Sequence, residues 1–224
     1  MKIKKGKLIV IEGTDGSGKA TQIELLARSL IKKGYKVKTA DFPQYDKPSS
    51  YFVSKYLRGE YGKVGPYKAS LFFALDRYDK SFEIKKWLSG GHIVISNRYV
   101  SANMGHQAGK IADLKERSVY LKWLQNLEYE IFDIPKPDLT ILLAMPPEIG
   151  QELVNQKAKR EYLKGAKRDI HEKDLKHLKD AFRAYLEVAK KYKWVIVNCV
   201  SGEKLNTREA IHEEILKKVQ RFAK

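Results

Sequence analysis

The sequence predicts an α/β fold with a five-stranded parallel sheet flanked by helices on both faces. Five short runs are almost continuously apolar, as strands are when helices cover both faces of a parallel sheet. Segments with helical spacing separate these runs, and such alternation is the pattern of a parallel α/β sheet. With 224 residues, 43% of them hydrophobic, the chain suits a single domain over residues 1–224.

The expected elements follow from these patterns in chain order. The strands share a near-continuous apolar run: residues 7–12, 35–42, 92–97, 139–145 and 194–199. The helices share apolar residues at helical spacing among good helix formers: residues 19–34, 65–91, 115–132, 172–192 and 207–222. Because ligands bind beyond the carboxyl ends of parallel strands, we expect the functional residues just after strands.

The composition narrows the class of protein. The formal charge of +17 fits either a nucleic-acid surface or an enzyme of polyanionic small molecules, but the lysines are scattered, so we expect no nucleic-acid groove. The apolar run 8–11 is too short for a signal peptide or a membrane span, which predicts a cytoplasmic protein without a membrane partner. The single cysteine, Cys199, lies in an apolar stretch and is expected to be a buried structural thiol.

A phosphate-binding loop is the strongest motif. Gly13, Gly18 and Lys19 have the spacing of the P-loop, after a predicted strand and before a predicted helix. Glycines let the backbone curl its N–H groups around an anion, and the lysine reaches the β- and γ-phosphates. The predicted ATP-binding residues of this loop are Gly13, Thr14, Asp15, Gly16, Ser17, Gly18, Lys19, Ala20 and Thr21.

Ala20 departs from the motif, because the usual Ser or Thr hydroxyl binds Mg²⁺. Either the ion is held through water and the phosphates, with help from Thr21, or the loop binds nucleotide without catalysis. Magnesium keeps several waters readily, so the first alternative is physically sound. The run also resembles the adenylate kinase loop, in which a Gly follows the lysine, and this favours catalysis.

Four further fragments extend the pattern. They are "FP" after the second strand, "LFFALDRYD" in a long helix, "NRYVSANMGHQ" after the third strand and "KPDLTILLAMPPEIG". With the loop, they resemble the thymidylate kinase family in order and spacing over nearly the whole chain. The resemblance implies a P-loop kinase fold, ATP and Mg²⁺ as cofactors, dTMP as the phosphate acceptor, and a homodimer.

The resemblance also implies roles for single residues. Asp15 matches the carboxylate that contacts the acceptor sugar and orients the monophosphate, although an Asp in a turn often caps its own loop. Arg98 matches the arginine that clamps the acceptor phosphate, and a bidentate guanidinium suits a dianion. With Lys19, these two residues are the implied catalytic set.

A base-binding wall is implied in the long helix. Phe73 matches the aromatic that stacks on thymine, and Arg77, one turn later, matches the arginine that hydrogen-bonds the base. The alternative is that Phe72 and Phe73 are core residues and Arg77 pairs with a neighbouring acid, and we adopt it for Phe72 only. The other implied acceptor contacts are Phe42, Asn97, Asn103, His106 and Gln107. In many members a Tyr packed against the deoxyribose stands in place of the histidine, which is expected to pack rather than titrate.

A basic segment at about residues 155–172 corresponds to the family's lid over ATP. Some members carry a catalytic Arg where this loop has Gly16, and members without it supply positive charge from the lid. The candidate lid cations are Arg160, Lys164, Lys167 and Arg168. A solvated helix face is the alternative for these residues.

Four positions depart from the family pattern: Ala20, Tyr45, Asn97 and Ala144. Asn97 replaces an Asp that supports Mg²⁺ and the acceptor. The predicted function is transfer of the ATP γ-phosphate to dTMP. The alternatives are a kinase of another deoxynucleotide or deoxynucleoside, or a nucleotide-binding protein that has lost transfer.

Overall fold

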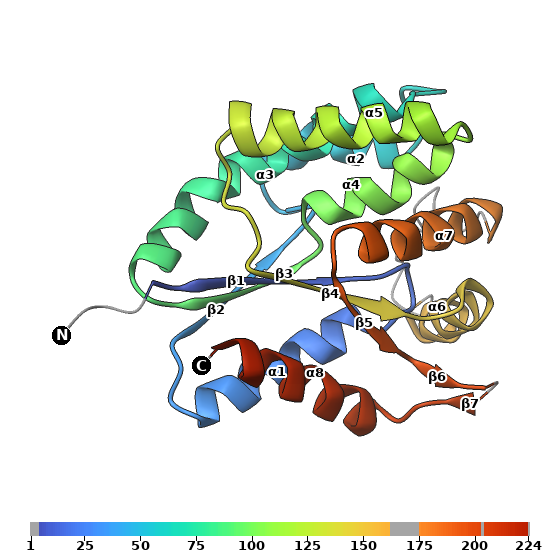
Figure 1. Cartoon of the computed structure of the whole chain (residues 1–224). Coiled ribbons are helices and arrows are strands. Elements are labelled where there is room, and N and C mark those ends of the chain that lie inside the picture. Colours follow the sequence, from blue (N-terminus) through green and yellow to red (C-terminus); the bar gives the residue numbers. More distant parts are fainter. Residues whose placement is uncertain (1–4, 162–174, 203, 224) are drawn as a thin grey trace.

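The computed structural model describes residues 5–161, 175–202 and 204–223. Within them, the main sheet has five parallel strands in the order β2-β3-β1-β4-β5 (Figure 1). These strands are β1 (Lys7–Glu12), β2 (Val37–Asp41), β3 (Ile93–Asn97), β4 (Leu139–Ala144) and β5 (Val195–Asn198). A short antiparallel pair, β6 (Val200–Ser201) and β7 (Lys204–Leu205), extends from β5. The predicted five-stranded parallel sheet is confirmed.

Helices cover both faces of the sheet, as predicted. The α-helices are α1 (Lys19–Lys32), α2 (Tyr51–Leu57), α3 (Pro66–Ser89), α4 (Val100–His106), α5 (Leu114–Gln125), α6 (Pro147–Glu161), α7 (Leu175–Lys191) and α8 (Arg208–Ala223). Shorter turns of helix are η1 (Pro48–Ser50), η2 (Ala108–Lys110) and the π-helix η3 (Asn126–Ile131). Figure 1 shows α1 and α8 on one face of the sheet and α3, α4 and α5 on the other.

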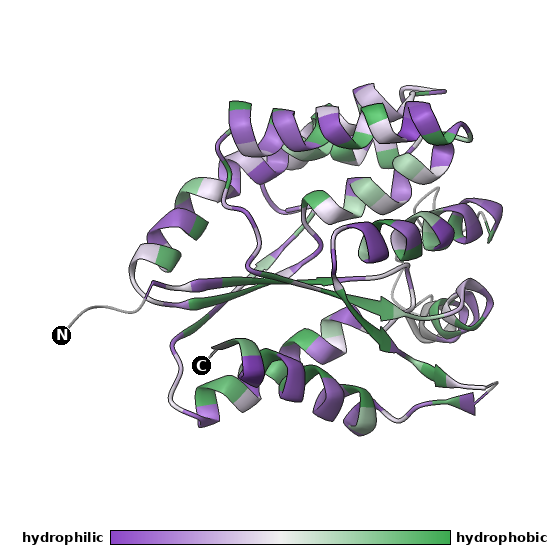
Figure 2. Cartoon of the chain, in the orientation of Figure 1, coloured by the Kyte–Doolittle hydropathy of each residue, from purple (hydrophilic) through white to green (hydrophobic). Residues whose placement is uncertain are grey.

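The core is divided by the sheet into two layers. Side chains alternate along β1, so Leu8 and Val10 pack with α3, α4, α5 and α7, while Ile9 and Ile11 pack with α1 and α8. All four side chains are fully buried, and each such burial contributes about 1.5–3 kcal/mol. Figure 2 shows the strands in green between helices that carry purple, hydrophilic residues. The near-continuous apolar runs of the sequence therefore reflect coverage on both faces.

Several elements were not predicted from the sequence. All of α4 except its last residue is buried, so its sequence lacks the polar stripe by which a helix is recognised. The helices α2 and α6 and the pair β6–β7 were also missed. The helix expected at 115–132 changes to the π-helix η3 after Gln125.

Strand register fixes which polar residues meet at the carboxyl edge of the sheet. Asn97 at the end of β3 is the register partner of Asp41 in β2 and of Ile11 in β1. Glu12, the last residue of β1, pairs with Leu142 of β4. The loop that follows β1 and the turn that follows β3 therefore start side by side.

The position of the single cysteine agrees with the sequence prediction. Cys199 is fully buried, and burial raises the pKa of its thiol to about 12, which suits a structural thiol. Among the described residues, no helix combines the length and the apolar character needed to cross a membrane.

A buried ion pair ties α3 to the π-helix. Arg77 donates from Nε and Nη2 to the two carboxylate oxygens of Glu128, each over 2.6 Å, and the two side chains are 1% and 0% exposed. The guanidinium also donates from Nη1 to the backbone oxygen of Tyr99, at 3.3 Å. A buried charge is tolerated only when paired in this way.

Replacing Glu128 with Ala is expected to lower the free energy of unfolding by about 3–5 kcal/mol, because it leaves an uncompensated buried charge. Urea denaturation measures the loss. The double variant Arg77→Met with Glu128→Leu serves as the control, since removing both charges together should cost less than removing one. A Glu128→Ala loss below about 1 kcal/mol would contradict the importance of the pair.

Candidate active site

The phosphate-binding loop joins β1 to α1, as the sequence predicts. Gly13, Gly16 and Gly18 have φ values of 151°, 79° and 83°, in the region that favours glycine. The helix α1 begins directly afterwards at Lys19, so its N-terminal backbone amides face the loop. This geometry suits an anion.

The glycine at position 16 is required by its neighbour. A Cβ there would lie 2.0 Å from the backbone oxygen of Gly150 in α6, and a Cβ on Gly150 would lie 2.7 Å from the backbone oxygen of Asp15. The loop and the start of α6 therefore lie so close together that only glycine fits at positions 16 and 150. A side chain at position 16, such as the Arg of some family members, does not fit this loop conformation.

Lys19 is folded inward over the loop. Its Nζ donates to the backbone oxygens of Gly13 and Thr14, both at 2.9 Å. Burial and, secondly, the positive charge of Arg98 lower the pKa of Lys19 from 10.5 to about 8. The hydroxyls of Thr14 and Ser17 are buried and have no hydrogen-bond partner among the described residues. A buried ammonium beside two unpaired hydroxyls fits the phosphates of a nucleotide.

Asp15 and His106, both predicted for the acceptor side, contact the side chain of Arg98. This residue has φ +63°, and its Nη2 is ion-paired with the carboxylate of Asp15. Its Nη1 donates to His106 Nε2 at 2.9 Å. Burial disfavours the charged form of Arg98. The nearby Asp15, followed by Tyr185 and Glu12, outweighs this effect, so the pKa of Arg98 lies above its usual value. The guanidinium is charged and directed toward the loop.

Glu12 is a central residue that the sequence did not predict. Its carboxylate is fully buried and accepts from the Tyr99 backbone N–H at 3.0 Å, the Ser101 hydroxyl at 2.7 Å and the Tyr185 hydroxyl at 2.9 Å. It therefore connects the end of β1 to the start of α4 and to α7. A single acidic residue ending an apolar strand was the available signal.

The remaining predicted acceptor residues lie around this cluster. Phe42 is buried with its ring centroid 5.8 Å from that of Tyr99. Asn103 and Gln107 are buried, and Gln107 Oε1 has no hydrogen-bond partner among the described residues. His106 also packs edge-on against Tyr185, with 5.5 Å between ring centroids. A buried unpaired amide oxygen is suited to a polar ligand.

The predicted base wall is mainly packed against protein. Phe72 lies among the aromatic rings of the α2–α3 region, and Phe73 contacts the Tyr56 ring edge-on with 6.0 Å between ring centroids. Arg77 pairs with a neighbouring acid, Glu128, which is the alternative that the sequence left open. Reading of the base by Phe73 and Arg77 remains a prediction.

The metal and lid predictions are only partly covered by the structure. No group of three or more His, Cys, Asp or Glu side chains able to hold a metal occurs in the described part of the chain. Asn97 donates from Nδ2 to Asp41 Oδ1 at 2.8 Å, and burial raises the pKa of Asp41. The predicted lid residues Lys164, Lys167 and Arg168, and the side chain of Arg160, lie outside the described residues.

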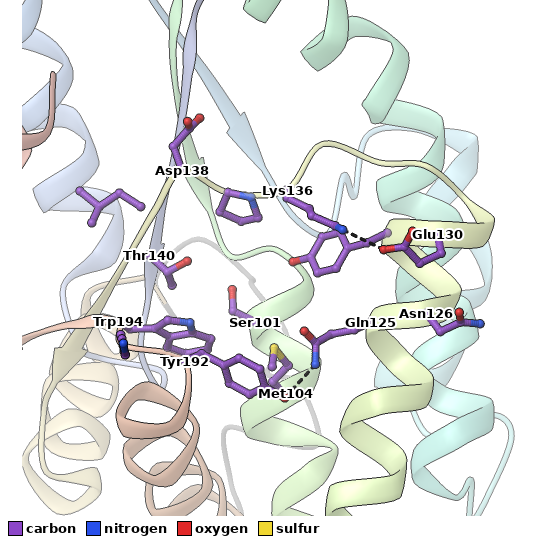
Figure 3. A pocket seen from close by; sticks show the side chains of 14 residues that line it. Ser101, Met104, Gln125, Asn126, Glu130, Lys136, Asp138, Thr140, Tyr192 and Trp194 are labelled. Carbon is purple, nitrogen blue, oxygen red and sulfur yellow. Dashed lines mark hydrogen bonds and ion pairs between the residues drawn. The ribbon is translucent and has the colours of Figure 1, made fainter.

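Two hollows occur near these elements. The first, of about 400 Å³, lies between α1 and the strands β2 and β3, and its lining includes Ala20, Asp41 and Asn97. The second, of about 440 Å³, is shown in Figure 3. At its rim Gln125 is hydrogen-bonded to Tyr192, and Lys136 is ion-paired with Glu130 (Figure 3). The second hollow contains no residue of the phosphate-binding loop and is not the candidate site.

Comparison with known proteins decides the family. A family model described as thymidylate kinase matches residues 11–215. The thymidylate kinase of Mycobacterium tuberculosis is 31% identical over 196 residues, which cover 85% of this chain and 90% of the relative. The chain belongs to the thymidylate kinase family. It is accordingly a phosphotransferase, as the sequence predicts.

Further relatives agree with the family and with the fold. The thymidylate kinase of Caldicellulosiruptor saccharolyticus is 31% identical over 222 residues, 98% of each chain. A solved thymidylate kinase structure from Candida albicans matches with a TM-score of 0.74 at 23% identity, covering 97% of this chain and 92% of that one. At that identity the likeness shows the fold, and the predicted P-loop kinase fold is confirmed.

The departures from the family pattern lie at different depths. Ala144 is buried at the end of β4, whereas the side chain of Tyr45 is 62% exposed. Asn97 stands at the carboxyl edge of the sheet between Asp41 and β1. Two of the four departures, Ala20 and Asn97, therefore line the same hollow.

Nucleotide affinity is expected to fall at alkaline pH, because phosphate binding requires Lys19 to be protonated. Below pH 8 the free protein already holds this proton, so the Kd for ATP should be nearly flat from pH 7 to 7.5. Above pH 8 binding must take up a proton, and the Kd should rise up to about tenfold per pH unit.

Calorimetric titrations with ATP at several pH values measure this dependence. The control is Lys19→Arg, whose charge does not titrate in this range and whose slope should be flat. A wild-type Kd that is equal at pH 7 and pH 9.5 would contradict the assignment.

Proposed function

We propose that this chain transfers the γ-phosphoryl group of ATP to dTMP, giving dTDP and ADP. One observation carries the proposal: Arg98, from the turn after β3, is ion-paired with Asp15 of the same loop whose backbone oxygens accept hydrogen bonds from Lys19. Two cations at neighbouring strand ends suit two phosphate groups. Family membership supports dTMP as the acceptor.

On the donor side, the loop residues 13–21 bind the ATP phosphates. Backbone amides and Lys19 neutralise the β- and γ-phosphates, and the unpaired Thr14 and Ser17 hydroxyls supply further donors. Mg²⁺ would supply positive charge to the same oxygens, with Thr21 near it and water in the place of the missing Ala20 hydroxyl. Arg160, Lys164, Lys167 and Arg168 are the proposed lid cations over ATP.

On the acceptor side, Arg98 holds the dTMP phosphate and Asp15 holds the sugar. The Asp15–Arg98 ion pair keeps both side chains in place before the acceptor arrives. Phe42, Phe73, Arg77, Asn97, Asn103, His106 and Gln107 are the proposed further contacts to the nucleotide. An acceptor phosphate is itself the nucleophile, so the transfer needs positioning and charge neutralisation rather than a strong base.

A homodimer is proposed through α3. Four of its apolar side chains, Leu71, Leu75, Tyr78 and Phe82, are 39–60% exposed and recur every three or four residues, so they share one face of the helix. An exposed apolar stripe of this kind suits a second copy of the chain. Light scattering is expected to give twice the monomer mass for the wild type and a smaller mass for Leu75→Glu with Phe82→Glu.

The matched control for the dimer is Ile31→Glu, on α1 across the sheet, where the side chain is 58% exposed. It should leave the mass unchanged. A wild-type protein that runs as a monomer at micromolar concentration would contradict the proposed dimer.

The cytoplasmic location also remains a proposal.

The test of function is ADP release from Mg-ATP with a panel of acceptors: dTMP, dUMP, dCMP, dGMP, dAMP and thymidine. Turnover should be greatest with dTMP, and Lys19→Ala should reduce it by at least about a hundredfold while the fold is retained. Equal or greater turnover with another acceptor would replace dTMP by that acceptor. ATP binding without any turnover, together with salt-dependent nucleic-acid binding, would favour a protein that has lost transfer.

A further inference from the structure

Three carboxylates lie at the carboxyl edge of the sheet near Lys19, and they differ in how fully they are used. Glu12 is buried and accepts three hydrogen bonds. Asp15 is ion-paired with Arg98. Asp41 accepts a side-chain hydrogen bond from Asn97, and the residue remains partly exposed to solvent. Asp41 is therefore the carboxylate best placed to accept further hydrogen bonds.

The position of Asp41 relates it to the phosphate-binding loop. It is the register partner of Asn97 across β2 and β3, and Lys19 and Arg98 both act on its charge. Asp41, Asn97 and Ala20 line one hollow of about 400 Å³. The Asp41 carboxylate thus shares a water-accessible space with Ala20, the position at which a P-loop usually has a Ser or Thr hydroxyl.

Asn97 carries a second polar atom next to Asp41. Its Nδ2 donates to Asp41, which leaves its Oδ1 as the remaining acceptor of the amide, and this oxygen is buried without a hydrogen-bond partner in the described part of the chain. A buried amide oxygen without a partner costs free energy unless a ligand or water fills it. Waters bound to a metal ion are strong donors that can satisfy both the amide and the carboxylate.

We propose that Asp41, with Asn97, holds the water shell of the Mg²⁺ ion that accompanies ATP. Magnesium in phosphate-transfer sites keeps several waters and is commonly bound through one or two carboxylates and the phosphates. Without a hydroxyl at position 20, the ion would keep one more water, and Asp41 would accept a hydrogen bond from such a water. The inference rests on the proposed function, since it concerns the metal of the same nucleotide site.

A simpler explanation is that Asp41 is a surface carboxylate that only positions the Asn97 side chain. The two explanations predict different metal affinities when the two groups are exchanged. If the carboxylate acts on the metal waters, a carboxylate on either member of the register pair should serve. If the carboxylate only positions the Asn97 side chain, exchanging the two groups should leave the metal affinity unchanged.

The experiment measures Mn²⁺ binding by electron paramagnetic resonance in the presence of a non-hydrolysable ATP analogue, which requires no acceptor and no turnover. Asp41→Asn should raise the Kd for Mn²⁺ by about tenfold or more, the usual effect of removing an outer-shell partner. The analogue alone, without metal, should bind the variant at least as well as the wild type. The double variant Asp41→Asn with Asn97→Asp should recover most of the Mn²⁺ affinity.

Asp46→Asn is the matched control for loss of one negative charge, because this side chain lies on the loop after β2 and is 80% exposed. It should change the Kd for Mn²⁺ less than twofold. Wild-type affinity in Asp41→Asn, or a double variant no better than the single one, would overturn the proposal. Failure of the proposed function would instead appear as wild-type protein that binds Mn²⁺ with the analogue but transfers no phosphate to any acceptor.

Discussion

The site depends on the hydrogen bonds that the buried carboxylate of Glu12 accepts. A carboxylate taken out of water is stable only when donors surround it, and here the donors come from the turn after β3, from α4 and from α7. Because Glu12 immediately precedes the phosphate-binding loop, the same hydrogen bonds fix the loop relative to these elements. Sheet register places the strand ends together, and Glu12 joins the loop after β1 to the turn after β3.

The unusual backbone of Arg98 is a consequence of this arrangement. Its φ of +63° is sparsely populated for a residue with a side chain, and the neighbouring Tyr99 amide is held by Glu12. In that conformation the guanidinium meets Asp15 of the loop. Phosphate chemistry needs fixed positive charge at two places, and the site supplies it before substrates bind.

The sequence predicted the parts of the molecule that have a local pattern. Apolar runs gave the five strands, and glycine spacing gave the phosphate-binding loop before α1. The contacts of Glu12 could not be predicted, since residues far apart in the chain make them. An acidic partner for Arg77 was an open alternative, but its identity, Glu128, could not be predicted because the two residues are 51 positions apart. The helix α4 was missed because burial on all sides removes its polar face. Asp41 could not be assigned a role from the sequence, because only the sheet register places it beside Asn97.

Transfer of one phosphate group from ATP to dTMP at this edge of the sheet can be followed in a single-turnover experiment. With γ-labelled ATP, Mg²⁺ and dTMP, such an experiment tracks the transferred group itself. We expect the label to appear in dTDP at the rate at which ADP forms. Label that remains in ATP, or that appears only as inorganic phosphate, would contradict it.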